Sequence, residues 1–169
     1  MRVGTLQASR LVKAEIARYD WARYRCGCQR LGDHVPELLE RLFAAEEPAD
    51  LRDCSLDGHL ESNTNLFEVA VPAVGVLLAG LAGPVSVPAR EQALATLWYL
   101  VSGESHQSEV KHGRTHLGDE CRLKAREGLW VILHHALNNR DETAYEILGL
   151  IDLNDERASY FAATASQRR

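Results

Sequence analysis

The stretch that most constrains the fold is residues 65–83, NLFEVAVPAVGVLLAGLAG, the most apolar part of the chain. Its apolar residues recur three and four positions apart, the spacing of one stripe along an α-helix. Val71, Val76 and Ala79 lie outside that stripe, so we expect neighbouring elements on more than one side. The stretch is too short and too closely flanked by polar residues for a membrane span. It predicts a central buried helix that is either kinked or restarted at Pro72, which lacks a backbone N–H donor.

The rest of the chain also carries helical spacing, and no segment keeps the alternation that is typical of a strand. We predict further helices over residues 5–18, 33–45, 49–61, 88–102, 117–138, 142–151 and 155–165. Asn65 and Glu68 have the spacing of a capping box at the start of the central helix. Residues 104–116 lack apolar periodicity and contain three histidines, which indicates a long polar loop. The sequence therefore predicts one all-α domain over residues 1–169.

Composition and charge narrow the classes of function. The chain is 46% hydrophobic and 25% charged, which is ordinary for a soluble globular protein. Its net charge of −5 disfavours a general nucleic-acid binder, which usually carries a basic surplus. The charge is uneven, because residues 1–34 hold seven Lys or Arg against three Asp or Glu, and residues 35–68 hold two against nine. The acidic segment 35–68 is a candidate partner surface, and solvated helix faces are the simpler alternative.

Four cysteines are present, and no apolar leader segment precedes them. We therefore expect a reduced, cytoplasmic setting without disulfides. Cys26-x-Cys28, with His34 beyond, is a weak metal motif, because zinc knuckles usually space their cysteines as C-x2-C. We interpret this pair as packing residues.

The stronger metal motif lies in the polar loop, where His106, His112 and His116 are followed by Cys121. Imidazole and thiolate are good zinc ligands, and a loop that enters a helix could gather them. The spacing matches no familiar structural zinc site, and the composition also suits plain solvent exposure. We therefore expect no obligatory cofactor, with zinc at the three histidines as the alternative.

A repeated pattern suggests the architecture. Val35-Pro36-x-Leu38-Leu39 matches Val71-Pro72-x-Val74 in form, and the two prolines are 36 residues apart. That period suits a solenoid of helix pairs. In these motifs the chain resembles HEAT-like or armadillo-like α-solenoids, especially the small helical-repeat proteins of actinobacteria. The resemblance implies an α-α superhelix of about three to four helix pairs, and an irregular helical bundle is the alternative.

The sequence favours a non-enzymatic module that binds a protein partner, and the resemblance implies an immunity or adaptor protein. The candidate contact residues are the acidic side chains Glu37, Glu40, Asp53, Asp57 and Glu61. One alternative is a metal-dependent or thiol enzyme that uses residues 104–121. A second alternative is a DNA-binding helical-repeat protein, which the net acidity opposes. Either a monomer or a homodimer fits the sequence.

Overall fold

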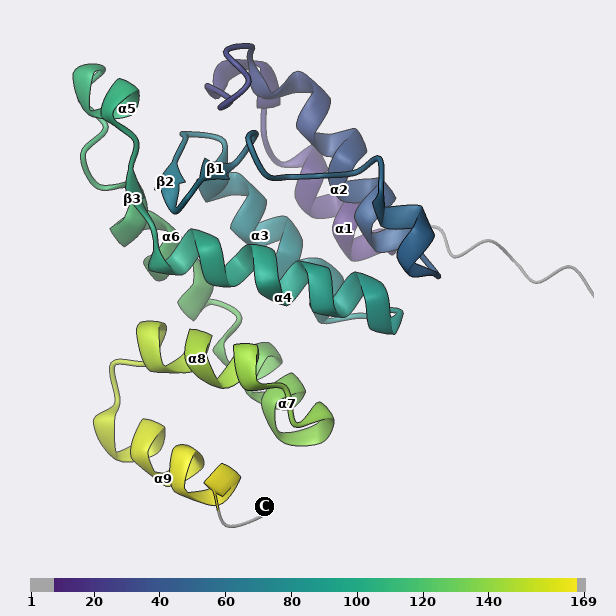
Figure 1. Ribbon diagram of the computed structural model, residues 1–169, viewed down its shortest axis with the longest axis vertical. Helices are drawn as coiled ribbons and strands as arrows, with labels where there is room; N and C mark the ends of the chain where they lie inside the picture. Colours follow the sequence, from purple (N-terminus) through teal and green to yellow (C-terminus); the bar gives the residue numbers. More distant parts are fainter. Residues whose placement is uncertain (1–7, 167–169) are drawn as a thin grey trace, which may run out of the picture.

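The computed structural model describes residues 8–166, and this part of the chain is mostly helical (Figure 1). Its α-helices are α1 (Arg10–Ala17), α2 (Val35–Ala44), α3 (Ala70–Leu81), α4 (Val87–Ser102), α5 (Gln107–Lys111), α6 (Leu117–Arg126), α7 (Leu129–Asn139), α8 (Glu142–Ile151) and α9 (Asp155–Ser166). Short 3₁₀ turns occur at Trp21–Arg23, Gly32–His34 and Pro48–Leu51. The all-α class is thus correct in outline. Among the described residues, no helix is long and apolar enough to cross a membrane.

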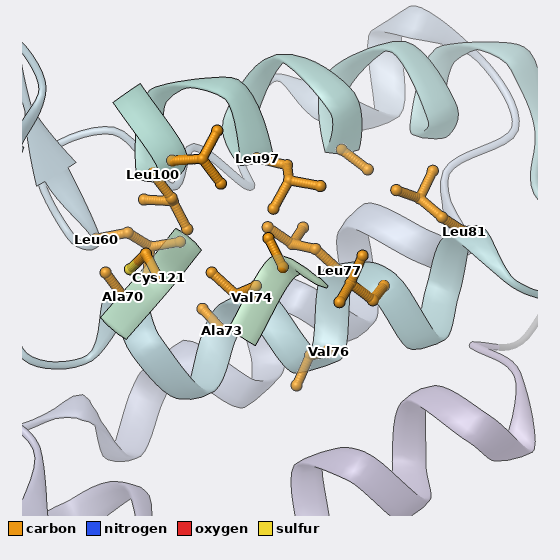
Figure 2. Close-up of a cluster of buried hydrophobic side chains, with 14 of the residues drawn as sticks. Leu60, Ala70, Ala73, Val74, Val76, Leu77, Leu81, Leu97, Leu100 and Cys121 are labelled. Carbon is orange, nitrogen blue, oxygen red and sulfur yellow. The ribbon is translucent and has the colours of Figure 1, made fainter. Parts of the chain in front are cut away.

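Helix α3 lies at the centre, as the sequence predicts. It contacts α1, α2, α4, α6 and α7. Ten of its twelve residues are buried, because its apolar side chains point to several neighbours at once. Figure 2 shows Val74 and Leu77 of α3 facing Leu97 and Leu100 of α4, with Cys121 of α6 beside them.

The start of α3 differs from the prediction. The helix begins at Ala70, with Val69 as an N-cap that makes no side-chain hydrogen bond, so the predicted capping box of Asn65 and Glu68 is wrong. Pro72 consequently falls in the first turn, where a backbone N–H has no intrahelical acceptor in any case. A proline there breaks no intrahelical hydrogen bond. The structure therefore agrees with the alternative in which the helix starts close to Pro72, and gives no reason for a kink.

The predicted helix over residues 117–138 is in fact two helices, α6 and α7, separated by Glu127 and Gly128. A Cβ atom at Gly128 would lie 2.4 Å from a methyl carbon of Leu78 on α3. A residue with a Cβ atom at this position would therefore force the Leu78 side chain to move. The break lets α7 turn and pack against α8.

The predicted absence of strands is wrong at three short segments. The strands β1 (Glu61–Ser62), β2 (Asn65–Leu66) and β3 (Glu104–Ser105) form a small sheet in the order β1-β2-β3. Strands β1 and β2 are antiparallel, and their turn residues Asn63 and Thr64 both have positive φ angles, as tight hairpins require. Strand β3 pairs in parallel with β2.

Two predicted segments change character around this sheet. The segment 49–61 contains no α-helix. Its first residues belong to the 3₁₀ turn Pro48–Leu51, and the rest form a loop that leads into β1. Leu56 and Leu60 are nevertheless buried in the core, so the apolar spacing there reflects an irregular segment. The predicted loop 104–116 contains β3 and α5. Figure 1 places α5, the sheet and the loop before α2 at one end of the molecule.

Candidate metal centre

Four potential metal ligands converge at this end of the molecule. They are the Sγ atoms of Cys26 and Cys28, Nε2 of His34 and Nδ1 of His59, all within 4.8 Å of one another. Among the described residues, this is the one group of three or more His, Cys, Asp or Glu side chains that could hold a metal ion. We call these four residues the Cys2His2 cluster.

Two loops supply the ligands. Cys26 and Cys28 lie between the first two 3₁₀ turns, His34 ends the second turn just before α2, and His59 lies in the loop before β1. The cysteine loop is a tight turn in which the N–H of Cys26 donates to the carbonyl of Arg30 at 3.0 Å. Gln29 completes the turn with a φ of 67°. This turn brings both thiols to the same side as His34.

Gly27 joins the two loops. Its N–H donates to the carbonyl of His59 at 2.9 Å. A Cβ atom at this position would lie 2.5 Å from the carbonyl oxygen of Gly58 and 2.5 Å from the ring of Phe67. A residue with a side chain would therefore separate the loops that carry the cysteines and His59.

The distances in the cluster fit a tetrahedral zinc site. Zinc bonds of about 2.3 Å to sulfur and about 2.05 Å to nitrogen place tetrahedral ligands about 3.8 Å apart for S–S, about 3.4 Å for N–N and about 3.6 Å for S–N. The S–S distance is 3.4 Å, and His34 Nε2 lies 3.0 Å from His59 Nδ1. The S–N distances are 3.6 Å from His34 Nε2 to each sulfur and 3.3 Å from His59 Nδ1 to Cys26. Five of the six edges therefore agree with a zinc site to within about 0.4 Å.

The two thiols have different protonation properties. Burial raises the pKa of Cys26 to about 12. Burial also raises the pKa of Cys28, but hydrogen bonds from the Arg30 backbone and from Cys26, together with the Arg30 side chain, outweigh it and leave a net pKa below the ordinary value. Cys28 is thus the more acidic of the two thiols, and Cys26 needs a cation to become a thiolate.

The two imidazoles are also suited to metal binding. Burial, reinforced by His34 and Arg30, lowers the pKa of His59, which favours the neutral ring that a metal needs. His34 turns Nε2 towards the cluster, and its buried Nδ1 has no hydrogen-bond partner. The nearest carboxylate oxygen belongs to Asp33, 3.8 Å from Nδ1. An acidic group at this position is the usual orienting partner of a metal-bound histidine.

The structure places the three histidines of the predicted metal loop apart from this cluster. His106 Nδ1 is within 2.8 Å of Ser108 Oγ, and its ring lies against Phe67. His112 is exposed at the end of α5, and His116 is exposed before α6, 3.9 Å from Asp119. These three do not form a group of the kind seen in the Cys2His2 cluster.

Cys121, the fourth residue of that predicted motif, is fully buried in α6, and burial raises the pKa of its thiol to about 12. A nucleophilic cysteine needs the opposite, an accessible thiol with a lowered pKa. This observation disfavours the thiol enzyme.

The predicted acidic contact residues also differ in exposure. Glu37, Asp53 and Asp57 are exposed, and Glu40 is half-buried. Glu61 is buried with 6% exposure, and its carboxylate accepts the N–H of Thr64 at 2.8 Å in the hairpin turn. Glu61 therefore supports the hairpin, and only the other four remain candidates for partner contact.

The sequence contains three of the four cluster residues, Cys26, Cys28 and His34, as a recognisable motif. We interpreted the two cysteines as packing residues, because C-x-C is not a common zinc spacing. The sequence does not connect His59 to this motif, because His59 lies 33 positions after Cys26 and no other member of the cluster lies in its own loop. Comparisons of the chain with protein-family models, curated proteins and solved structures find no match. The interpretation of the site therefore depends on its geometry.

Proposed function

We propose that this protein binds one zinc ion through Cys26, Cys28, His34 and His59. The observation that carries the proposal is the tetrahedral spacing of two sulfur and two nitrogen atoms contributed by two separate loops. Two thiolates and two imidazoles are a typical ligand set of structural zinc sites, in which no coordination position is left for a substrate. The role of the metal is therefore structural: it ties the loop 24–34 to the loop before β1.

Elemental analysis of the purified protein tests this proposal. We expect about one zinc per chain, loss of the metal in Cys28→Ser and in His59→Ala, and tetrahedral thiolate spectra after cobalt substitution. The matched control is the triple variant His106→Ala, His112→Ala, His116→Ala, which should keep its zinc. Loss of zinc in the triple variant, with retention in the cluster variants, would place the metal at the histidine loop instead. Absence of stoichiometric metal would refute both sites.

A pH titration of the same samples provides a second readout. Because burial raises the pKa of Cys26 to about 12, its thiol is protonated at neutral pH before the metal binds. Zinc binding must displace that proton, so the apparent zinc affinity should fall as the pH is lowered. A zinc affinity that does not change with pH would argue against thiolate ligands.

We further propose that the protein is a non-enzymatic binding module for a basic protein partner, of the immunity or adaptor type, built on a HEAT-like helical repeat. The proposal is supported by the order of the chain, in which His34 comes directly before the acidic residues Glu37, Asp53 and Asp57, and His59 comes directly after them. A metal bound to both would hold Glu37, Asp53 and Asp57 in fixed positions, which favours partner binding by reducing the ordering cost.

Charge reversal tests this second proposal. The protein is mixed with the purified product of an adjacent gene, and binding is measured for the unmodified chain and for the double variant Glu37→Lys, Asp53→Lys. We expect weaker binding and a smaller salt dependence for the variant. The control Glu156→Lys, at an exposed position on α9, should bind normally. Equal binding of all three proteins would exclude the acidic surface as the contact.

A further inference from the structure

A pocket of about 800 Å³ lies beside the Cys2His2 cluster. Three segments line it: the loop 25–31, the hairpin region from Gly58 to Phe67, and the start of α5 from His106 to Glu109. These segments are far apart in the sequence but gather at one end of the molecule (Figure 1). The volume is in the range of pockets that bind small molecules, about 300 to 1,000 Å³.

Around this pocket the positively charged side chains outnumber the negatively charged ones. Arg25 and Arg30 line it, together with the carboxylate of Glu109, which is 1% exposed. The third guanidinium nearby, on Arg114, already binds Glu68 at 2.8 Å. Three arginines therefore face two carboxylates, in a chain whose net charge is −5. The local excess is positive where the whole molecule is negative.

The contacts of Glu109 leave arginine donors available to a ligand. Arg25 Nε lies 3.9 Å from Glu109 Oε1, which is too long for a hydrogen bond. Glu109 Oε2 lies 3.5 Å from Arg114 Nη1, and neither of these two buried atoms has a hydrogen-bond partner. Glu109 thus lies close to Arg25 without a hydrogen bond to it, and the half-exposed Arg25 side chain keeps its donors free for a ligand. Burial also raises the pKa of Glu109, although Arg114 and Arg25 oppose this shift.

We propose that this pocket binds a small organic anion, whose phosphate or carboxylate group is held by Arg25 and Arg30. The guanidinium group presents a planar fork of N–H donors that matches both kinds of oxyanion. Ser62 and Ser108 also line the pocket and add neutral polar groups to its wall. The inference goes beyond the zinc site, although both share the loop that carries Cys26, so zinc content is measured in every sample.

Calorimetric titration of the zinc-loaded protein tests the proposal with four probes: inorganic phosphate, adenosine monophosphate, citrate and uncharged adenosine. We expect saturable binding of at least one anion and none of adenosine. Binding of the two phosphates but not of citrate would support a pocket for phosphate groups. Binding of citrate but not of the phosphates would support a pocket for carboxylate groups. Arg25→Gln should weaken binding by about tenfold or more. The control Arg23→Gln, whose side chain is exposed and lies 3.7 Å from Asp20, should bind like the unmodified protein.

Arg30→Gln serves as a second variant, because the Arg30 side chain also influences the Cys28 thiol. If Arg30→Gln loses both zinc and anion binding, the loss of the anion can follow from the loss of the metal. In that case the Arg25→Gln variant alone tests the anion pocket. Lack of saturable binding by all three anions, or unchanged affinity in a zinc-loaded Arg25→Gln protein, would overturn the proposal. A protein that holds no stoichiometric zinc but still binds an anion would refute only the zinc site. A zinc-loaded protein that binds no anion would refute only the pocket, so the two failures are distinguishable.

Discussion

Gly27 is the residue on which the two ligand loops depend most directly. It lies between the two cysteines, donates to the carbonyl of His59, and packs against the backbone of Gly58. The neighbouring carbonyl is backbone, so it cannot move aside as the end of a flexible side chain would. The absence of a Cβ atom at this one position therefore permits the contact that brings His59 to the cysteines.

We expect Gly27→Ala to lower the free energy of unfolding by about 1–3 kcal/mol, because a methyl group forced into a packed contact shifts the backbone. Zinc affinity should fall as well. Chemical denaturation and a competitive zinc-chelator titration measure the two effects. The matched control is Gly149→Ala on α8, where a Cβ atom would meet nothing within 4 Å. That change should be neutral or slightly stabilising, since alanine favours helix. Equal behaviour of the two variants would contradict the role of Gly27.

At the scale of elements, the C-terminal end of α3 depends on α7. The ring of His135 is 5% exposed, and its Nε2 donates to the carbonyl of Leu81 at 2.8 Å. The carbonyls of the last helical turn have no intrahelical donors, so this contact satisfies a buried group. Asn139 lies 3.0 Å from the other ring nitrogen. The neighbouring His134 is exposed, because adjacent residues on a helix point about 100° apart.

Substitution of these two adjacent histidines should separate a structural role from a surface position. We expect His135→Ala to lower the free energy of unfolding by about 2–4 kcal/mol, because it leaves a buried carbonyl unpaired and opens a cavity. His134→Ala should change it by less than about 0.5 kcal/mol, as exposed positions usually do. Urea denaturation followed by circular dichroism measures both values. A larger loss in His134→Ala would show that the orientation of α7 is different.

At the scale of the whole molecule, the helical core and the Cys2His2 cluster lie in different kinds of structure. The core is formed by contacts of α3 with α4 and α6, and of α4 and α7 with α8. The cluster instead links two irregular segments that contain short 3₁₀ turns and loops. Because these segments contain no long helix or strand, we expect a metal cross-link to stabilise them more than it stabilises the helices.

Removal of zinc should therefore have a local effect. We expect a chelator to speed amide hydrogen exchange by about tenfold or more in the segments 24–34 and 54–62. Exchange in α4 and α8 should stay unchanged. Hydrogen exchange with mass spectrometry measures both regions in one experiment, and re-addition of zinc is the control for reversibility. Uniform acceleration along the chain would show that the metal supports the whole fold, and no change anywhere would refute the structural site.

The elements that sequence reasoning located best are those with long apolar stripes. The central helix, the helix near 88–102 and the helix 142–151 all follow from spacing within the segment itself. The break at Gly128 was missed, because glycine also occurs within helices and the contact of this position with Leu78 joins distant parts of the chain. Segment 49–61 was assigned as helix, because Leu56 and Leu60 are spaced like a helical stripe although they reach the core from a loop.

The sequence by itself determined the helical class and the buried central helix, because both depend on periodicity over a few neighbouring residues. Only the tertiary structure decided the Cys2His2 cluster and the arginine pocket beside it. The cluster requires His59 to meet residues 25 to 33 positions earlier, and no local pattern encodes that meeting. It arises from a glycine that allows two loops to touch and from a hairpin that turns the chain back after His59.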